Sequence, residues 1–294
     1  MSTYAYLDGA WVNSADAHLP LSIQGLQYGT AAFEGIRAYS CHTGGFPRPF
    51  MAEEHYERLH TSCEALRITL DNSCAELAAL TSELIERNAI RDDCYIRPVV
   101  FKTMFLPGTP FGVRLAGVGH SIALTLVPMK SRLGETTRLG IATTRRVPDA
   151  SMPARAKISG AYVASALAVD ECTASGYDDA LLLTSEGRVA EAATSNIILR
   201  HGGELVTPSL DQGILPGITR SLVLTYGRET SLNVCERPVE LIELFNADEV
   251  ILVGTGVEIS PVTSVSGNPI GNGTTGEFSA ALIEYFRKIT RFAE

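Results

Sequence analysis

Lysine is scarce in this sequence: 24 of the 294 residues are lysine or arginine, and only four of those are lysines. The six cysteines have no C-x-x-C spacing, so the sequence predicts neither a metal site nor a disulfide framework. No apolar run reaches the roughly eighteen residues of a membrane span, and the first residues are mixed in polarity rather than basic and then apolar. We therefore expect a soluble, cytoplasmic protein with reduced thiols and no membrane partner.

The formal net charge of -9 argues against a nucleic-acid partner and against an anionic membrane surface. A basic pair such as Arg145-Arg146 could still form a local anion site within an acidic molecule. The hydrophobic content of 45% is ample for one large or two medium domains. Small anionic ligands therefore remain possible partners.

Local patterns predict many short strands with interspersed helices, which is typical of an α+β protein rather than of regular βαβ alternation. A polar, Gly-containing segment at 129–137 predicts an interdomain loop between an N-terminal domain (1–128) and a C-terminal domain (138–294). The predicted helices cover 53–65, 73–88, 160–174, 218–230, 239–245 and a last helix opened by the capping box Thr274-x-x-Glu277. A second capping box, Ser73-x-x-Glu76, opens the helix predicted at 73–88. The predicted strands cover a hairpin at 4–13, which turns at Asp8-Gly9, and the segments 94–101, 121–127, 139–144, 179–183, 189–193, 196–200, 204–206, 249–253 and 259–265.

In the strand predicted at 94–101, the two-residue period places Tyr95 and Arg97 on the same face. Pro98 cannot donate a ladder hydrogen bond, which would suit an edge strand with a solvated arginine. The alternative is that both side chains point into a site.

Lys157 differs from the other lysines, Lys102, Lys130 and Lys288, which occupy positions where an arginine would serve equally well as a surface charge. It lies among small residues in 154–162 and precedes an uncharged helical run. A primary amine can form a Schiff base with an aldehyde, which a guanidinium cannot. The alternative is a lysine at a helix start whose stem lies along apolar surface.

Two segments could bind an anion. Leu215–Arg220 opens a helix, so free backbone N–H groups and the Thr219 hydroxyl could cradle a phosphate, although a Pro-initiated helix needs no ligand. The small-residue turn Gly254–Glu258 follows an apolar strand and could offer further N–H donors.

Glu191 is a lone carboxylate in a small, mainly apolar stretch, so it needs a partner if it is buried, unless it lies exposed at a strand end. A pyridinium nitrogen would be such a partner. Lysine, phosphate cradle and carboxylate together match the aldehyde, phosphate and ring nitrogen of pyridoxal 5'-phosphate.

Over nearly its whole length the chain resembles the branched-chain amino acid aminotransferases, which belong to the fold-type-IV pyridoxal phosphate enzymes. This resemblance implies a small N-terminal α/β domain, a larger C-terminal domain with a barrel-like sheet, and a homodimer that completes the site. The stretches that carry it occur in order: Tyr28–Arg37, Tyr95–Pro98, the Lys157 segment, Glu191–Asn196, Leu215–Arg220 and Gly254–Pro261.

The resemblance also implies individual roles. Lys157 would be the catalytic Schiff-base lysine, Tyr162 would hydrogen-bond the ring oxygen of the cofactor, and Glu191 would pair with its ring nitrogen. The implied phosphate ligands are Arg58, Ile218, Thr219 and Thr255, and the implied substrate-binding residues are Tyr28, Phe33, Tyr95, Arg97, Gly256 and Val257.

Three departures from the family pattern concern the substrate pocket: Ala161 replaces an asparagine, Thr144 a tryptophan, and Arg132 an aromatic residue. The expected reaction is ping-pong transamination between an L-amino acid, with a branched aliphatic side chain, and 2-oxoglutarate. The alternatives are a D-amino acid or (R)-amine aminotransferase and an aminodeoxychorismate lyase, against which Tyr95-x-Arg97 argues. A non-catalytic cofactor-binding protein is a remote alternative, because Lys157 and Glu191 are both present.

Overall fold

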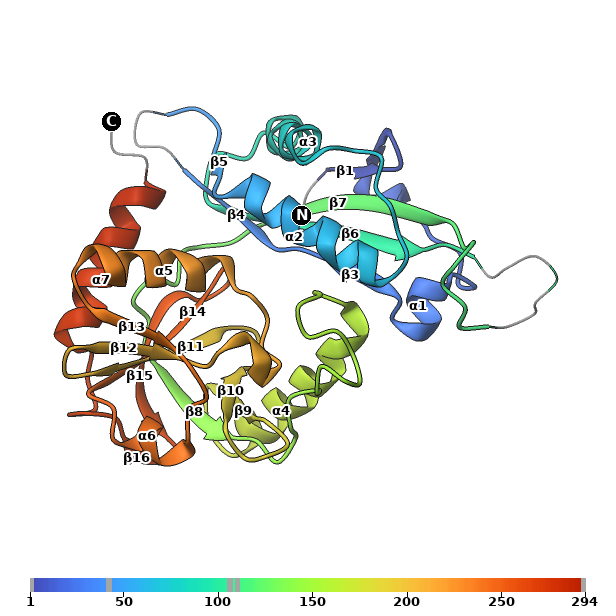
Figure 1. Ribbon diagram of the computed structural model, residues 1–294. Coiled ribbons are helices and arrows are strands. Elements are labelled where there is room, and N and C mark those ends of the chain that lie inside the picture. Colours follow the sequence, from blue (N-terminus) through green and yellow to red (C-terminus); the bar gives the residue numbers. More distant parts are fainter. Residues whose placement is uncertain (1–2, 41–43, 105–107, 109–111, 292–294) are drawn as a thin grey trace.

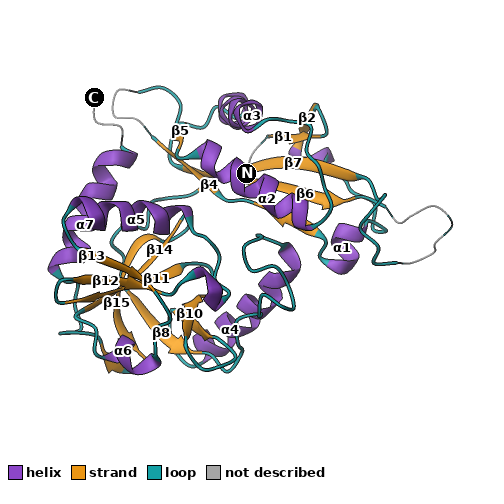
Figure 2. Cartoon of the chain, in the orientation of Figure 1, coloured by secondary structure: helices purple, strands orange, loops and turns teal. Residues whose placement is uncertain are grey.

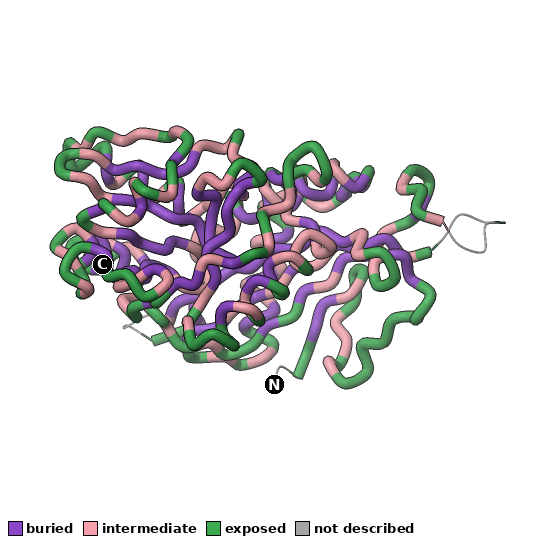
Figure 3. The backbone as a smooth tube through the Cα atoms, turned by 90° about the horizontal axis from the view of Figure 1, so that it is seen from below, coloured by how far each residue is buried: buried purple, intermediate pink, exposed green. Residues whose placement is uncertain are grey.

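The computed structural model describes residues 3–40, 44–104, 108 and 112–291. These residues form two β-sheets with helices packed on them, which confirms the predicted α+β class (Figures 1 and 2). Buried residues follow the strands of both sheets, whereas the connecting loops are largely exposed (Figure 3).

The first sheet has the strand order β2-β1-β7-β6-β4-β5, and β3 also pairs with β6. Its strands are β1 (Tyr4–Leu7), β2 (Ala10–Asn13), β3 (Ala31–Phe33), β4 (Ile36–Tyr39), β5 (Arg48–Pro49), β6 (Cys94–Lys102) and β7 (His120–Pro128). The helical segments of this half are η1 (Ser14–Asp16), α1 (Gln24–Tyr28), α2 (Ala52–Ala65) and α3 (Cys74–Arg87).

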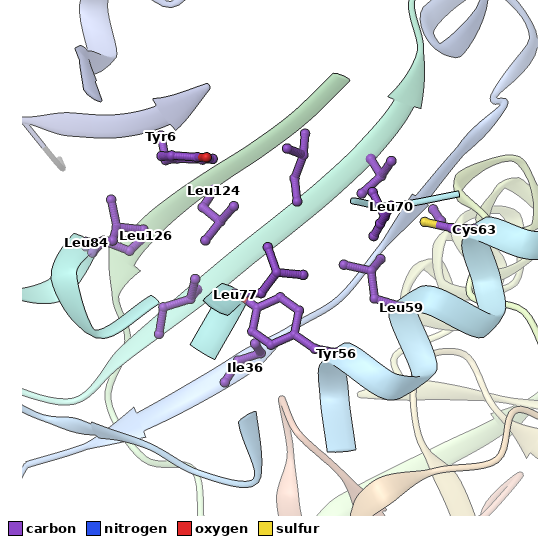
Figure 4. Packing of buried hydrophobic residues seen from close by; sticks show 14 of the residues in the cluster. Tyr6, Ile36, Tyr56, Leu59, Cys63, Leu70, Leu77, Leu84, Leu124 and Leu126 are labelled. Atoms are coloured by element: carbon purple, nitrogen blue, oxygen red, sulfur yellow. The ribbon is translucent and has the colours of Figure 1, made fainter. Parts of the chain in front are cut away.

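Helices α2 and α3 bury their apolar faces against this sheet. Tyr56 and Leu59 of α2 and Leu77 of α3 pack with Ile36 and Leu124 of the sheet in one fully buried cluster (Figure 4). The predicted capping box of α3 is present: the Ser73 hydroxyl accepts from the Glu76 N–H, and the Glu76 carboxylate accepts from the Ser73 N–H.

The second sheet is curled and has the strand order β10-β9-β8-β15-β14-β11-β12-β13, with β16 paired to β15 (Figure 1). Helix α4 packs on β8 and β9, α5 packs on β13 and β14, and α7 packs on β14 and β15. The strands are β8 (Thr137–Ile141), β9 (Asp179–Leu183), β10 (Val189–Ala192), β11 (Asn196–His201), β12 (Glu204–Thr207), β13 (Asn233–Glu236), β14 (Glu249–Gly254), β15 (Glu258–Val265) and β16 (Asn268–Pro269). The helical segments are η2 (Ser159–Ala161), α4 (Tyr162–Ala174), η3 (Leu210–Gln212), α5 (Ile218–Glu229), α6 (Leu241–Phe245) and α7 (Glu277–Thr290).

The chain passes from the first sheet to the second between Pro128 and Thr137, within the predicted interdomain loop. The two halves pack against each other, because Tyr39 of β4 lies in one apolar cluster with Phe286 of α7, at a ring-centroid distance of 6.4 Å. The Arg291 guanidinium also pairs with the Asp93 carboxylate at 2.7 Å. The division into two domains at this loop stays a prediction.

Strand β6 is central, so the edge-strand alternative for Pro98 is wrong. Pro98 lies opposite the break between β3 and β4, where its own carbonyl accepts from the Glu34 N–H at 2.9 Å. The N–H that proline lacks would point to the same side as this carbonyl, at a position where neither strand continues the ladder. A proline is therefore tolerated in the middle of this sheet.

Lys102 is also not a surface charge, because its side chain is only 1% exposed. Its ammonium donates to the carbonyls of Arg67 and Val118, each at 3.0 Å. A compact ammonium with three donors can serve two converging carbonyls at the end of a buried strand.

The N-terminus of α7 differs from the predicted capping box. The helix begins at Glu277 after the N-cap Gly276, and Thr274 instead bonds to Asn272. The Glu249 carboxylate of β14 accepts from the N–H groups of Phe278 and Ser279 at 2.9 and 2.8 Å. A carboxylate that is distant in the sequence thus caps this helix, in place of a side chain from the residues next to the helix start.

We expect Glu249→Ala to lower the free energy of unfolding by about 1 to 2 kcal/mol, because two N–H groups at the start of α7 lose their acceptor. Urea unfolding of the purified protein measures this. Glu277→Ala is the matched control, since this exposed glutamate lies in the same first turn without capping it. Equal losses in the two variants would contradict a capping role for Glu249.

Candidate active site

A cavity of about 420 Å³ lies between the two halves of the molecule. Side chains from β3, α2 and β6 of the first half face residues of the second half across it. Its wall includes Phe33, Arg58, Tyr95, Arg97, Met129, Arg146, Lys157, Tyr162, Glu191, Ser195, Asn196, Gly217, Ile218, Thr219, Thr255 and Gly256. Most of the predicted site residues are therefore brought together, and the volume suits a small organic ligand.

Lys157 is held by both halves of the chain. Its N–H donates to the Ser62 hydroxyl of α2 at 2.9 Å, and its carbonyl accepts from the Phe33 N–H of β3 at 3.1 Å. Its amine donates to the Tyr162 hydroxyl at 2.5 Å. Gly29, with φ of 67°, lies so close to Gly160 that a Cβ would come within 2.8 Å of the Gly160 Cα, which keeps this loop against the end of α1.

The pKa of Lys157 is lowered to about 8. Burial is the main cause, because a desolvated ammonium is costly, and the positive charges of Arg58 and Arg97 act in the same direction. Burial also raises the pKa of Tyr162 far above its usual range. The amine therefore faces a neutral phenol and loses its proton near neutral pH more readily than an exposed lysine.

Glu191 of β10 is buried, so the alternative of an exposed glutamate at a strand end is wrong. Its carboxylate lies 2.6 Å from Arg146 Nε and accepts from Asn196 Nδ2 at 2.9 Å and from the Leu215 N–H at 3.2 Å. Burial raises the pKa of Glu191, and the charge of Arg146 opposes that rise. Arg146 thus pairs with an anion, as the basic pair Arg145-Arg146 suggested, but this anion is the Glu191 carboxylate of the same chain.

The predicted phosphate cradle lies at the start of α5. Gly217 is the N-cap without any capping side chain, so the first N–H groups of the helix, at Ile218 and Thr219, lack intrahelical partners. A Cβ on Gly217 would lie 1.9 Å from Asn196 Oδ1, so only glycine allows this close approach. Arg58 faces the same end of α5 and donates from Nη1 to the Pro216 carbonyl at 2.9 Å.

The turn at Thr255 and Gly256 completes this side of the cavity, and it is held by a residue to which the sequence reasoning gave no role. Arg37 of β4 is 1% exposed and donates to the carbonyls of Thr255 and Gly256 at 3.1 and 3.2 Å. It also donates to the carbonyls of Met129 and Lys130. Arg37 lies in Tyr28–Arg37, one of the stretches that carry the family resemblance. This stretch is the signal in the sequence that could have identified Arg37 as a residue of the site.

Phe33, Tyr95 and Arg97 form the opposite wall. Arg97 Nη2 donates to the Tyr95 hydroxyl at 2.9 Å, and the guanidinium carbon lies 4.6 Å from the centroid of the Phe33 ring. A Cβ on Gly35 would lie 1.8 Å from the Tyr95 hydroxyl, so the break between β3 and β4 makes room for this tyrosine. The shared face predicted for Tyr95 and Arg97 is thus turned toward the site.

Two predicted substrate residues do not line the cavity. Tyr28 is 42% exposed at the end of α1, and Val257 packs against the core of the second sheet. Arg132 pairs with Glu135 at 2.8 Å on the exposed surface, whereas Met129 of the same loop lines the cavity. Thr144 also lies outside the cavity wall, and Ala161 lies in it.

The described part of the chain holds no cluster of three or more histidine, cysteine, aspartate or glutamate side chains suited to a metal ion. Within the same residues, no helix is both long and apolar enough to cross a membrane.

A lysine amine, an anion cradle and a buried carboxylate around one cavity are the parts of a pyridoxal phosphate site. A family model described as amino-transferase class IV matches residues 31–265. The fold and the site therefore define a class IV amino-transferase.

Individual relatives narrow this class. A probable branched-chain-amino-acid aminotransferase of Aquifex aeolicus is 39% identical over 292 residues, covering 98% of this chain and 92% of that protein. The branched-chain aminotransferase of Thermoproteus uzoniensis with norvaline matches with a TM-score of 0.91 and 32% identity, covering 99% of this chain and 95% of that one. The branched-chain aminotransferase of Escherichia coli gives a TM-score of 0.92 and 31% identity, covering 100% of this chain and 97% of that one. The chain belongs to the branched-chain aminotransferase family and is an aminotransferase, as the resemblance predicted.

A further solved branched-chain amino acid aminotransferase carries a ligand that bears on the cavity. It is complexed with N-(5'-phosphopyridoxyl)-L-glutamate, and it matches with a TM-score of 0.91 and 32% identity, covering 99% of this chain and 94% of that one. A relative of the same fold therefore binds a phosphopyridoxyl group joined to an acidic amino acid.

We expect the Lys157 amine of the cofactor-free protein to titrate with a midpoint near pH 8, well below that of an ordinary lysine. The rate at which acetic anhydride labels the Lys157 peptide, followed against pH by mass spectrometry, measures this midpoint. Because the unfolded chain binds this proton more tightly, folding should gain stability as the pH rises from about 8 to about 10. Lys157→Met should remove that gain, and a labelling midpoint near pH 10 would contradict the lowered pKa.

Proposed function

We propose that this aminotransferase uses pyridoxal 5'-phosphate to exchange an amino group between a branched-chain L-amino acid and 2-oxoglutarate in a ping-pong reaction. The observation that carries the proposal is the Lys157 amine, desolvated and bonded to Tyr162, between the α5 cradle and Glu191. The relative complexed with phosphopyridoxyl-glutamate supports both the cofactor and an acidic substrate.

The residues present fit this cofactor. Arg58, Thr219 and the N–H group of Ile218 would hold its phosphate, together with Thr255 on the facing turn. The Ser195 hydroxyl is buried in the cavity wall and has no hydrogen-bond partner among the described residues, which is expected where a polar ligand binds. When bound, pyridoxal phosphate supplies an aldehyde for the lysine and a ring that accepts electron density from the substrate α-carbon.

Lys157 is the proposed proton carrier. With its pKa lowered to about 8, a substantial fraction of the amine is neutral near physiological pH and can accept a proton from the substrate α-carbon. The Tyr162 hydroxyl at 2.5 Å orients the amine. Glu191 would keep a proton on the ring nitrogen, and its bonds to Asn196 and Leu215 fix the carboxylate for that role.

The substrate would bind between Phe33, Tyr95 and Arg97 on one wall and Gly256 on the other. Phe33 and Met129 offer apolar contacts for an aliphatic side chain, whereas Arg97 can pair with a carboxylate. Arg97 Nε is buried without a hydrogen-bond partner among the described residues, so the guanidinium retains a donor for a ligand. The same pocket would then serve both half-reactions.

We further propose a cytoplasmic homodimer. Leu26 of α1 and Val163 and Leu167 of α4 are large apolar side chains that are each more than half exposed in the single chain. Exposed apolar side chains of this size favour association with a second copy. A second copy packed on α1 would also cover Tyr28 at the end of that helix and give it a place in the site.

Borohydride reduction of the cofactor-loaded protein tests the proposed chemistry. We expect the loss of a visible absorption band and a pyridoxyl adduct on the Lys157 peptide, because only an amine facing the cofactor aldehyde can be trapped. Lys157→Ala should lose the adduct and all turnover while remaining folded. An adduct on Lys102, Lys130 or Lys288 would falsify the assignment, and a donor screen with both enantiomers then separates branched L-amino acids from D-amino acids and amines.

Arg97→Ala should raise the Michaelis constant for 2-oxoglutarate and glutamate roughly tenfold to a hundredfold while changing that for leucine much less. The reason is that the acidic substrates lose a charge-assisted hydrogen bond worth about 1.5 to 3 kcal/mol. Steady-state kinetics with each substrate varied in turn measure the difference. Equal damage to both substrate types would instead place the carboxylate common to all amino acids at Arg97.

A further inference from the structure

Glu34 is a fully buried carboxylate to which the proposed chemistry gives no role, although it lies in the motif Phe33-Glu34-Gly35. It lies behind the cavity wall rather than in it. It accepts from Arg58 Nε at 2.7 Å, from Arg58 Nη2 at 2.9 Å and from His55 Nδ1 at 2.8 Å, and the Gly35 N–H completes the set at 3.2 Å. Four donors therefore converge on one carboxylate directly behind Arg58.

These contacts fix the orientation of the Arg58 guanidinium. Glu34 occupies Nε and one hydrogen of Nη2, and the Pro216 carbonyl occupies one hydrogen of Nη1. A guanidinium has five N–H groups, so one remains on each of Nη1 and Nη2. Both are charged donors of the kind that bind phosphate oxygens, and Arg58 lies in the cavity wall.

The charges show what Glu34 contributes. Burial alone would raise the pKa of Glu34, but the charge of Arg58, with hydrogen bonds from His55 and Arg58, lowers it well below its usual range. Burial lowers the pKa of His55, so His55 donates its Nδ1 proton as a neutral ring. Glu34 and Arg58 thus form a charge-compensated pair, and what Glu34 adds to the site is orientation rather than positive charge.

We propose that Glu34 is a positioning residue for phosphate recognition, which holds Arg58 so that its two remaining N–H groups are available to a phosphate in the cavity. This inference rests on the proposed function, since the phosphate is that of the cofactor. Two opposing effects make it testable. Removing the Glu34 charge would strengthen the attraction of Arg58 for a phosphate, whereas losing the two-bond contact would disorder the guanidinium.

The experiment compares the affinities of the cofactor-free protein for pyridoxal 5'-phosphate and for pyridoxal, which lacks the phosphate. Because the two ligands differ only in the phosphate, the ratio of their affinities measures how much the phosphate contributes to binding. In Glu34→Gln, the amide offers one acceptor and turns its NH₂ toward N–H donors, so we expect the ratio to fall about tenfold while pyridoxal affinity changes less than about twofold. Arg58→Ala should lower the ratio at least as much, and the double variant should show little further loss.

Asp93→Asn is the matched control. Asp93 makes a comparable two-bond contact with Arg291, at 2.7 and 2.8 Å, but neither residue lines the cavity. It should lower stability and leave the affinity ratio unchanged. Should Glu34→Gln fail to fold, Arg58→Lys tests the same inference, because lysine keeps the positive charge without the planar fork. Most of the preference for pyridoxal 5'-phosphate over pyridoxal should then be lost.

An unchanged or increased ratio in Glu34→Gln, or a retained ratio in Arg58→Lys, would overturn the positioning role. Equal weakening of both ligands would also overturn it, because that pattern marks a general structural defect. If the unaltered protein forms no reducible adduct on Lys157, the proposed function fails and this inference fails with it. A normal adduct together with an unchanged ratio overturns the inference alone.

Discussion

The site depends on keeping one amine out of water between two halves of the chain. Lys157 lies in a loop of the second half, but its backbone is bonded to Ser62 of α2 and Phe33 of β3 in the first. The first half therefore helps to fix the loop from which the amine donates to Tyr162. The same packing removes the solvent that would otherwise stabilise the ammonium, so a single arrangement both places the amine and lowers its pKa.

Local patterns in the sequence predicted most of the elements, because periodicity and turn residues act over a few positions. The hairpin at Asp8-Gly9 and the capping box at Ser73 are examples, and both are present. Contacts between distant segments could not be predicted in this way. The Glu249 cap on α7, the buried Lys102 and the central position of Pro98 each depend on a partner far away in the chain.

The same distinction applies to the site. The residue types that bind a cofactor stood out individually, because a rare lysine or a lone carboxylate needs an explanation. The residues that hold them did not stand out in this way. Arg37 looks like any other arginine in a chain that has twenty, and the pair Arg145-Arg146 indicated an anion without showing which one. Their roles appear only when the carbonyls of Thr255 and Gly256 or the carboxylate of Glu191 lie next to them in space.

The arginines around the cavity also indicate where a substrate carboxylate can bind. Arg58 is paired with Glu34 at 2.7 Å and Arg146 with Glu191 at 2.6 Å, while Arg37 is surrounded by carbonyls. Arg97 is the exception, because its partners among the described residues are the Tyr95 hydroxyl and aromatic faces, with no carboxylate within ion-pair distance. A partly buried cation without a counter-ion is unfavourable, and an anionic ligand would relieve that cost. Arg97 is therefore the arginine of this set that we propose for the substrate carboxylate.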